Sequence, residues 1–283
     1  IKKVGFEPSN LWNICDDPSV RIINDYFNEQ SFNREFPGRK PKLITSIAMF
    51  YDLDDPNKFV GDVKKILDKN GLWTIQMNYL GTMIEQSTFD NVSHEHLEYY
   101  SLLSLESLLK RHDLEVFDLE VNEVNGGSFR TYIKHKGSNI KGFKLAEKRL
   151  DDLRNYESSL RLDRLETYQD FGNKVRAISD RLNEFLTEEV QQGKKIYVMG
   201  ASTRGLVVLQ SARIDNHLIS AAADKNPNKE GKFIVGTGIP IISLEKARKE
   251  NPDYFLVLPY QYKKELIHQE KKYLENGGKM IFA

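Results

Sequence analysis

The amino-acid sequence predicts an α/β protein with two lobes, each built around a largely parallel sheet. Its 283 residues exceed the usual size of a single hydrophobic core. Short apolar runs typical of strands alternate with helical patterns from the start of the chain, and the alternation begins again near residue 195. Because parallel strands need crossover connections, this order predicts two doubly wound units.

Strands and helices alternate through the first half of the chain. Apolar runs typical of strands lie at residues 1–6, 21–23, 43–50 and 72–77. Between the last two runs, Asp55-Pro56 begins a helical pattern and Asn70-Gly71 ends it. We therefore expect parallel strands joined by a right-handed crossover here.

The pattern changes towards the end of the first lobe. A helix is expected at residues 104–112, followed by strands at 115–120 and 129–134 that pair antiparallel across a short glycine turn. The first lobe is expected to span residues 1–137. Residues 138–193 are rich in charge and contain no proline, so two or three connecting helices are predicted there.

A second alternating pattern fills residues 194–283. Strands are expected at residues 196–199, 218–223, 255–258 and 279–282. Helices are expected at residues 206–212 and 263–276. This order predicts a C-terminal Rossmann-like lobe.

Charge and composition limit the kinds of partner. The 41 basic and 41 acidic residues cancel, so no overall field draws the chain to nucleic acid or to an anionic membrane. A small-molecule substrate is the expected partner. No run approaches the roughly 18 apolar residues of a membrane span. The single Cys15 indicates a reducing compartment, so the cytoplasm is the expected location.

Acidic residues at two strand ends are candidates for nucleotide binding. Glu7 follows the first predicted strand, where nucleotide-binding α/β folds place a carboxylate that accepts hydrogen bonds from ribose hydroxyls. The alternative is a solvated residue at a strand end. Asp25 follows the next strand and is interpreted either as a contact to an adenine amino group or as a helix cap.

The first half of a nucleotide site is missing ahead of Glu7. The glycine-rich turn that normally precedes such a carboxylate by about 20 residues is not in the sequence. The chain also starts at Ile1, inside an apolar run, rather than at a methionine. We therefore expect that residues have been removed upstream; otherwise this polypeptide holds its cofactor in an unusual way.

The densest group of titratable side chains lies at residues 91–101. Two histidines, His94 and His96, flank Glu95, and imidazole is the commonest general base near neutral pH. A metal site would need further ligands, because the two histidines point to opposite sides if the segment is extended. The remaining alternative is a polar loop.

Two glycine-rich turns are further candidates. In the first, Gly126-Gly127 allows close backbone approach to a ligand and Arg130 could bind an anion, although a simple hairpin turn explains the glycines equally well. In the second, at residues 200–205, a strand leads into a helix whose N-terminus favours anions, with Arg204 adding charge. Ser202 stands where a dinucleotide fingerprint has its second glycine, so NAD binding is not favoured.

Several segments together resemble the S-adenosylmethionine-dependent sugar C-methyltransferases of deoxysugar biosynthesis. The matching segments are residues 5–9, 93–101, 126–130, 200–205 and 224–240. The resemblance spans nearly the whole chain and implies a class I methyltransferase-like lobe, incomplete at its N-terminus, joined by helices to the C-terminal lobe. Family members also have an N-terminal zinc-binding domain, which is absent here together with the first strand and glycine loop of the methyltransferase lobe.

The resemblance also implies a reaction and roles for individual residues. His96 is similar to the family's base, which removes a proton beside the ketone of a nucleotide-linked sugar, with Glu95 and His94 next to it. S-adenosylmethionine is the implied cofactor, with Glu7, Ser9 and Asp25 as its contacts, and no metal ion is implied in this part of the chain. The expected substrate contacts are Tyr79, Tyr99, Tyr100, Asn125, Ser128, Arg130, Ser202 and Arg204.

Two departures from the family pattern keep other functions open. Ser93 stands where the family usually has tyrosine, and residues 50–53 lack a histidine that often occurs there. Both changes would lie near the sugar, so another substrate or methyl transfer to oxygen is an alternative. A non-catalytic nucleotide-sugar binding protein is the competing function from another class, and an NAD-dependent oxidoreductase is a weaker one.

Overall fold

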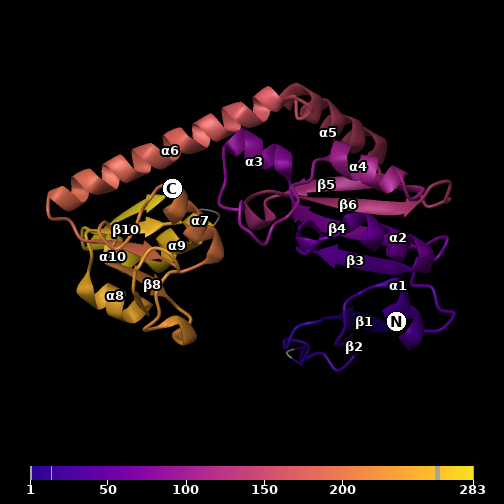
Figure 1. Ribbon diagram of the computed structural model, residues 1–283, viewed down its shortest axis with the longest axis horizontal. Helices are drawn as coiled ribbons and strands as arrows, with labels where there is room; N and C mark the ends of the chain where they lie inside the picture. Colours follow the sequence, from indigo (N-terminus) through magenta and orange to yellow (C-terminus); the bar gives the residue numbers. More distant parts are fainter. Residues whose placement is uncertain (1, 14, 259–261, 283) are drawn as a thin grey trace. The chain divides into compact units, whose positions relative to one another are not determined.

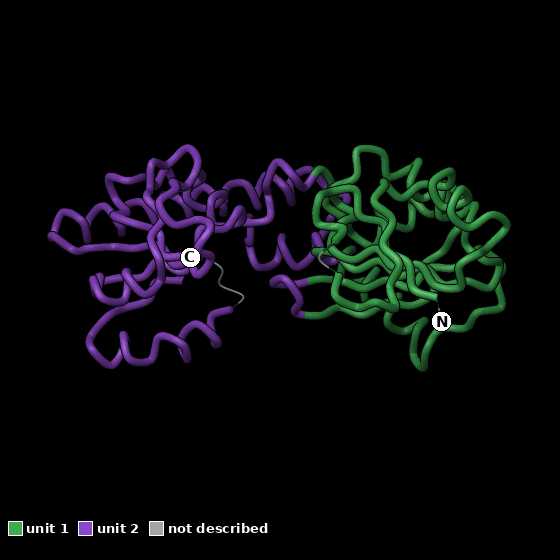
Figure 2. Tube along the Cα trace, turned by 90° about the horizontal axis from the view of Figure 1, so that it is seen from below, with its two compact units in different colours: residues 1–78, 97–122, 128–157 green, residues 79–96, 123–127, 158–283 purple. Residues whose placement is uncertain are grey.

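A computed structural model describes residues 2–13, 15–258 and 262–282 of the chain. Ile1, with which the first predicted strand begins, lies outside this part. The described residues form two compact units, shown in different colours in Figure 2. Unit 1 comprises residues 1–78, 97–122 and 128–157, and unit 2 comprises residues 79–96, 123–127 and 158–283.

Unit 1 contains a four-stranded sheet in the order β3-β4-β6-β5 (Figure 1). Its strands are β3 (Leu43–Ile47), β4 (Leu72–Asn78), β5 (Leu114–Asn122) and β6 (Ser128–His135). The first two are parallel, whereas β6 pairs antiparallel with both β4 and β5. The predicted antiparallel pairing at the end of this lobe is thus confirmed.

The first two strands of unit 1 form a separate parallel pair. They are β1 (Lys3–Phe6) and β2 (Val20–Ile23), in a register that places Phe6 opposite Ile23. Within the described residues, neither strand pairs with the four-stranded sheet. The sheet of this unit is therefore in two pieces, which the sequence patterns did not predict.

The helices of unit 1 begin and end at recognisable sequence signals. Asp55 caps α2 by accepting from the amide of Lys58, and Ser101 with Ser104 forms a reciprocal capping box on α4. The helices are α1 (Glu29–Glu35), α2 (Pro56–Ile66), α4 (Leu102–Lys110) and α5 (Ala146–Leu160), with the 3₁₀ turn η1 (Phe50–Asp52). The third strand was predicted to reach residue 50, and this was wrong, because Ala48 adopts a left-handed conformation (φ 53°) and ends it.

Unit 2 is built around a five-stranded parallel sheet in the order β11-β10-β7-β8-β9. Its strands are β7 (Ile196–Met199), β8 (Ala221–Asp224), β9 (Ile241–Ser243), β10 (Tyr254–Val257) and β11 (Lys279–Phe282). Alternate residues of β7 enter two separate cores: Ile196 and Val198 pack on one face, and Tyr197 and Met199 on the other. Because both faces are covered, the predicted Rossmann-like, doubly wound fold is confirmed. The short strand β9 was not predicted.

The helices of unit 2 cover the two faces of this sheet. Leu186 of α6 and Leu209 of α7 belong to one core, and Ala247 of α8 belongs to the other. The helices are α3 (Leu80–Gln86), α6 (Leu165–Gln191), α7 (Thr203–Ser211), α8 (Leu244–Glu250), α9 (Lys263–Gln269) and α10 (Lys271–Glu275), with the 3₁₀ turns η2 (Val124–Gly126) and η3 (Pro227–Lys229). None of the helices in the described part of the chain is both long and apolar enough to cross a membrane.

A single helix was predicted at residues 263–276, and this was wrong. The chain leaves helical geometry at Glu270 (φ −98°, ψ 22°), which separates α9 from α10. The Glu270 side chain is buried and pairs with the guanidinium of Arg248 on α8. A buried carboxylate needs such a partner, and the helical periodicity gives no sign of it.

Two segments from the first half of the sequence pack with the C-terminal half. Residues 79–96 and 123–127 both belong to unit 2, and Phe89 joins the core that contains Leu209 and Leu256. The units are thus defined by packing and are discontinuous in sequence. The division at residues 137 and 193 stays a prediction.

Truncating Phe89 should destabilise unit 2 rather than unit 1. We expect Phe89→Ala to lower the free energy of unfolding by about 3 kcal/mol, because a buried aromatic ring is lost from a packed core. Denaturant unfolding followed by circular dichroism measures this change. Val92→Ala, a truncation at an exposed position three residues on, is the control and should have almost no effect. Equal stability of Phe89→Ala and Val92→Ala would show that the segment does not contribute to the core.

Candidate active site

Glu7 stands at the carboxyl end of β1 as a charged group. Its amide donates to the carbonyl of Ile23, which continues the parallel pairing for one residue beyond the strand. Its Oε1 accepts a hydrogen bond from the amide of Ser9 at 2.9 Å. The contacts with Ser9 lower the pKa of the Glu7 carboxyl below its usual value. The structure thus presents a carboxylate where the sequence predicted a ribose contact.

The loop that follows Glu7 is held from the neighbouring strand. The side-chain amide of Asn24 donates to the carbonyl of Glu7 at 2.8 Å and to that of Ser9 at 3.1 Å. The Ser9 hydroxyl in turn accepts from the amide of Leu11 at 3.1 Å. Asn24 was not among the predicted site residues. Its position directly after β2 was the available signal, because parallel strands end at the same edge of a sheet.

Asp25 is engaged by helix α1. Its Oδ2 accepts from the Ser31 hydroxyl at 3.0 Å and from the Arg34 guanidinium at 2.7 Å, and its Oδ1 accepts from the amide of Tyr26. The Arg34 and Ser31 contacts lower the pKa of this carboxyl. The interpretation of Asp25 as a helix cap was wrong, because Asn28 caps α1 by accepting from the amide of Ser31, while Asp25 binds side chains of the same helix. Its contact with a cofactor stays a prediction.

A cavity of about 530 Å³ separates the two pieces of the unit 1 sheet. Consecutive residues of β1 and of β3 line it, so the backbone edges of both strands face the space. It is also lined by the phenylalanine rings Phe27, Phe32, Phe36 and Phe59. The space is therefore bounded by two open strand edges and covered by apolar side chains, as the slot for a further strand would be.

The histidine cluster forms a tight turn in unit 2. The amide of His96 donates to the carbonyl of Ser93 at 3.2 Å, and the turn leaves His94 and Glu95 exposed and His96 partly buried. The two histidines were expected on opposite sides only if the segment was extended. Because the segment turns, that expectation does not apply. No group of three or more metal-binding side chains occurs in the described ranges.

A carbonyl group fixes the protonation of His96. The ring Nδ1 lies 2.8 Å from the backbone oxygen of Asn91. A carbonyl oxygen only accepts hydrogen bonds, so Nδ1 carries the proton in the neutral ring and Nε2 carries the lone pair. This tautomer is compatible with a general base, and the role of His96 as that base stays a prediction.

The two tyrosines after the histidine turn lie in unit 1 beside η1. The carbonyl of Tyr51 accepts from the amides of Leu97 and Glu98, which fixes the entry to this segment. Tyr100 is buried with its ring 5.2 Å from that of Phe50, and burial raises the pKa of its hydroxyl. Burial also raises the pKa of Tyr99. Both phenols therefore stay neutral at physiological pH and keep a proton to donate.

The Gly126-Gly127 turn is joined to the start of α3. The amide of Tyr79 donates to the carbonyl of Gly127 at 3.2 Å, and Tyr79 itself is buried. A Cβ on Gly127 would lie 2.4 Å from the side chain of Thr82, so glycine is needed for this close approach. Asn125 adopts a left-handed conformation (φ 54°) in the same turn. The glycines thus serve packing within unit 2.

The polar residues that follow this turn lie on the unit 1 sheet. Ser128 is buried at the start of β6. The Nε of Arg130 donates to Oε1 of Gln76 on β4 at 2.7 Å, and its Nη1 lies 3.7 Å from Oε1 of Glu120 on β5. Arg130 is therefore flanked by two acceptors, and its role as an anion ligand stays a prediction.

The turn at residues 200–205 leads from β7 into α7, as predicted. The hydroxyl of Ser202 caps the helix by accepting from the amide of Gly205 at 3.1 Å. Arg204 pairs with Asp90, which is buried, and donates to the carbonyl of Asn125 at 3.0 Å. Both predicted substrate contacts on this turn are thus engaged within unit 2, and substrate binding by them stays a prediction.

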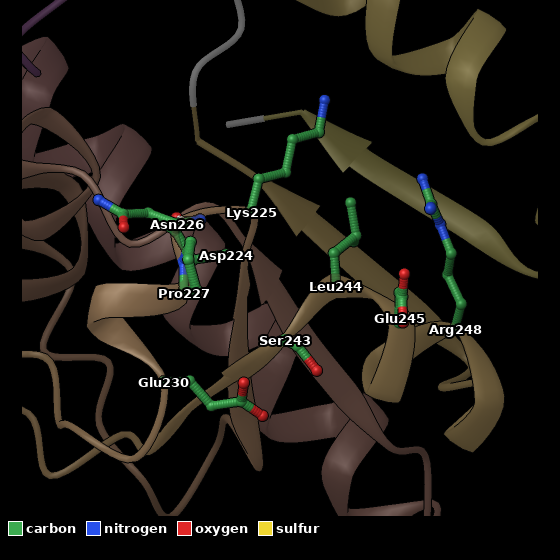
Figure 3. Close-up of a pocket in the computed structure, with 9 residues that line it drawn as sticks. All are labelled: Asp224, Lys225, Asn226, Pro227, Glu230, Ser243, Leu244, Glu245 and Arg248. Carbon is green, nitrogen blue, oxygen red and sulfur yellow. Dashed lines mark hydrogen bonds between the residues drawn. The ribbon is translucent and has the colours of Figure 1, made fainter.

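A smaller cavity of about 330 Å³ lies at the ends of β8 and β9. Figure 3 shows Asp224 and Asn226 on one side of it and residues of α8 on the other. Oδ2 of Asp224 accepts from the amide of Ala201 at 2.9 Å and from Lys229 at 3.1 Å. Burial acts to raise the pKa of Asp224, but these contacts and the amide of Asn226 lower it overall. The carboxylate of Asp224 is occupied in holding two turns of the lobe.

The arrangement of unit 1 defines a class of protein. A carboxylate at a strand end and an antiparallel strand in the last pair of an otherwise parallel sheet are features of S-adenosylmethionine-dependent methyltransferases of class I. A family described as "Methyltransferase domain" matches residues 3–119. Residues 123–283, more than half of the chain, match the family described as "C-methyltransferase C-terminal domain". The chain belongs to this C-methyltransferase family.

A similar protein of known name is the C-methyltransferase NovU of Streptomyces niveus. It is 29% identical over 281 residues, which are 98% of this chain and 66% of that protein. The chain therefore spans just under two thirds of the length of this relative.

Solved structures resemble parts of the chain weakly. An S-adenosylmethionine-dependent methyltransferase from Clostridium acetobutylicum has a TM-score of 0.36 at 14% identity and covers 48% of this chain and 76% of its own. A methyltransferase from Thermotoga maritima, described as a possible histamine N-methyltransferase, has a TM-score of 0.35 at 14% identity and covers 46% and 72%. Scores at this level carry no argument about the chain.

The lowered pKa of Asp224 predicts a pH-dependent contribution to stability. Because its pKa is lower in the folded state, the contribution is present above the usual carboxyl pKa of about 3.9 and is lost as the pH falls through the folded value. We expect Asp224→Asn to cost about 1 kcal/mol at pH 7 and progressively less below pH 4. Chemical denaturation at several pH values measures this. Asp180→Asn, which removes an exposed ion pair with Arg213, is the control. A constant difference across pH would contradict the assignment.

Proposed function

We propose that the whole protein transfers a methyl group from S-adenosylmethionine to a carbon atom of a nucleotide-linked keto sugar or a similar polar metabolite in the cytoplasm. The observation that carries this proposal is the hydrogen bond between His96 Nδ1 and the Asn91 carbonyl, which leaves Nε2 as the base. Membership of the C-methyltransferase family supports carbon as the methylated atom.

The residues of β1 fit one end of the cofactor. An ionised carboxylate at a strand end accepts hydrogen bonds from ribose hydroxyls, and the lowered pKa keeps Glu7 in that form. Asn24 and Ser9 hold the loop beside it. The glycine-rich loop expected for the other end of the cofactor is not in this sequence.

We propose that the slot between β1 and β3 takes a further strand in the whole protein. Such a strand would pair with both open edges and bury the phenylalanine rings that line the cavity. A glycine loop at its end would then stand beside Glu7.

The proposed reaction begins with proton removal from the substrate. Nε2 of His96 takes the proton from the carbon beside the ketone, and the Asn91 carbonyl stabilises the imidazolium through Nδ1. Glu95, one residue away, is proposed to orient the site or to relay charge. S-adenosylmethionine, when bound, would supply an electrophilic methyl group: the new bond to the substrate carbon would form as the methyl–sulfur bond breaks, and S-adenosylhomocysteine would leave.

Replacing His96 should slow the methyl-transfer reaction without weakening the binding of cofactor or substrate. We expect His96→Asn to lower turnover by about 10² to 10⁴-fold, the usual worth of a positioned base, with the fold and cofactor affinity retained. Glu95→Gln should have a smaller effect. His94→Asn is the matched control, because His94 is exposed in the same turn. Solvent deuterium exchange at the sugar carbon, measured in the full-length protein without methyl donor, reports the base directly.

The outcomes of this measurement separate the candidates. Slow deuterium exchange in His96→Asn with normal exchange in His94→Asn would support His96 as the base. The opposite result would make His94 the base. If neither variant slows deuterium exchange or methyl transfer, the histidine cluster has a structural role and no catalytic one. Substrate binding without any turnover in the full-length protein would favour the non-catalytic nucleotide-sugar binding protein.

Replacing Glu7 should weaken cofactor binding in the full-length protein. We expect Glu7→Ala to reduce the affinity for S-adenosylmethionine by about tenfold to a hundredfold, the scale of lost charge-assisted hydrogen bonds. Calorimetry measures the affinity, and Asp17→Ala, another exposed carboxylate near β2, is the control. Unchanged affinity in Glu7→Ala would remove Glu7 from the cofactor site.

A further inference from the structure

We propose that Arg204 is a positioning residue for methyl transfer: through a buried ion pair with Asp90, the Rossmann-like lobe holds the loop that presents His96. This inference rests on the proposed function, because it needs His96 to be the base. It reassigns a residue for which the sequence predicted an anion ligand. All of the contacts that carry it lie within unit 2.

The guanidinium of Arg204 joins three distant parts of the sequence. Its Nε donates to Oδ2 of Asp90 at 2.7 Å, and its Nη2 lies 2.6 Å from the same oxygen. Its Nη1 donates to the carbonyl of Asn125 at 3.0 Å. One rigid cation in the first turn of α7 is thus bound to residues that precede it by 114 and 79 positions.

A displacement of Asp90 would be transmitted along the backbone to the group that contacts His96. The side chain of Asp90 is only 5% exposed, and Asp90 lies between two fixed neighbours. On one side, Phe89 is part of the core of unit 2. On the other side, Asn91 provides the carbonyl that accepts from Nδ1 of His96. The ion pair therefore fixes the backbone next to the group that sets the tautomer of the base.

The burial of Asp90 makes its partner necessary. Burial raises the pKa of the Asp90 carboxyl, whereas the charge of Arg204 opposes that effect. Within the described structure, Oδ1 of Asp90 is buried without a hydrogen-bond partner, so Arg204 supplies the side-chain compensation for this carboxylate. Removing the cation leaves a buried charge whose remaining compensation is the backbone hydrogen bonds at Asp90 and Asn91, so the carboxylate either takes up a proton or moves towards water. Movement of Asp90 displaces the Asn91 carbonyl with it.

The expected effect concerns turnover and not cofactor binding. We expect Arg204→Gln to lower kcat by about tenfold to a hundredfold, since a displacement of about 1 Å costs up to that much. The affinity for S-adenosylmethionine should not change, because the proposed ribose contact Glu7 belongs to the other unit. Arg213→Gln removes an exposed ion pair of the same lobe and should leave kcat unchanged.

A double variant separates positioning from simple loss of stability. Asp90→Asn combined with Arg204→Gln replaces the ion pair by two neutral amides and leaves no buried charge. We expect this variant to recover part of the kcat lost in Arg204→Gln. Arg204→Lys keeps the charge but has no planar fork to contact both Asp90 and Asn125, so its kcat should be intermediate.

The decisive readout is the tautomer of His96, measured by nitrogen NMR of the imidazole in the full-length protein without substrate. Wild type and Arg213→Gln should show a protonated Nδ1, and Arg204→Gln should show a mixture of tautomers. This measurement does not depend on turnover. If His96→Asn proves fully active, the proposed function fails while the tautomer shift still reports the ion pair.

Two results would overturn the inference. One is an unchanged His96 tautomer together with an unchanged kcat in Arg204→Gln. The other is a raised KM for the nucleotide-linked substrate with kcat unaltered, which would make Arg204 an anion ligand. In that second case, Asp90→Asn would release the guanidinium and tighten substrate binding, whereas the positioning role predicts a lower kcat for the same variant.

Discussion

A buried carboxylate requires a partner. In this chain, the partner of the buried Asp90 lies in the C-terminal half of the sequence, and the segment that carries the candidate base packs with that half. Arg204 satisfies the carboxylate from the first turn of α7, and Phe89 beside it enters the core of the Rossmann-like lobe. The segment that contains His96 therefore packs with the C-terminal half of the sequence. Under the proposed function, the lobe presents the turn that carries the candidate base.

Open strand edges are the second constraint on this protein. Exposed edges of β1 and β3 face one cavity lined by aromatic rings, and such edges are normally paired or covered. The same edges lead to Glu7, so the proposed pairing with a further strand and the proposed cofactor site are two aspects of one arrangement. Completion of the sheet would place backbone amides and the carboxylate at a common end of parallel strands.

Local signals predicted most of the secondary structure. The cap at Asp55, the glycine turn at Gly126-Gly127 and the apolar run that forms β7 all act over a few residues, and each was found from the sequence. The helix α1 was missed although Asn28 caps it locally, whereas two other missed features depend on distant partners. The break at Glu270 reflects its pairing with Arg248, and the loop contacts of Asn24 depend on strand pairing between β1 and β2.

The sequence by itself determined the α/β class and the types of residue available for chemistry, because periodicity and turn residues act locally. The tertiary structure alone decided what those residues do. His96 acquired its tautomer from a carbonyl oxygen five residues away in a turn, and Arg204 acquired its carboxylate partner from 114 residues away. Hydrogen bonds and buried charges depend on distance in space, which spacing along the chain does not specify.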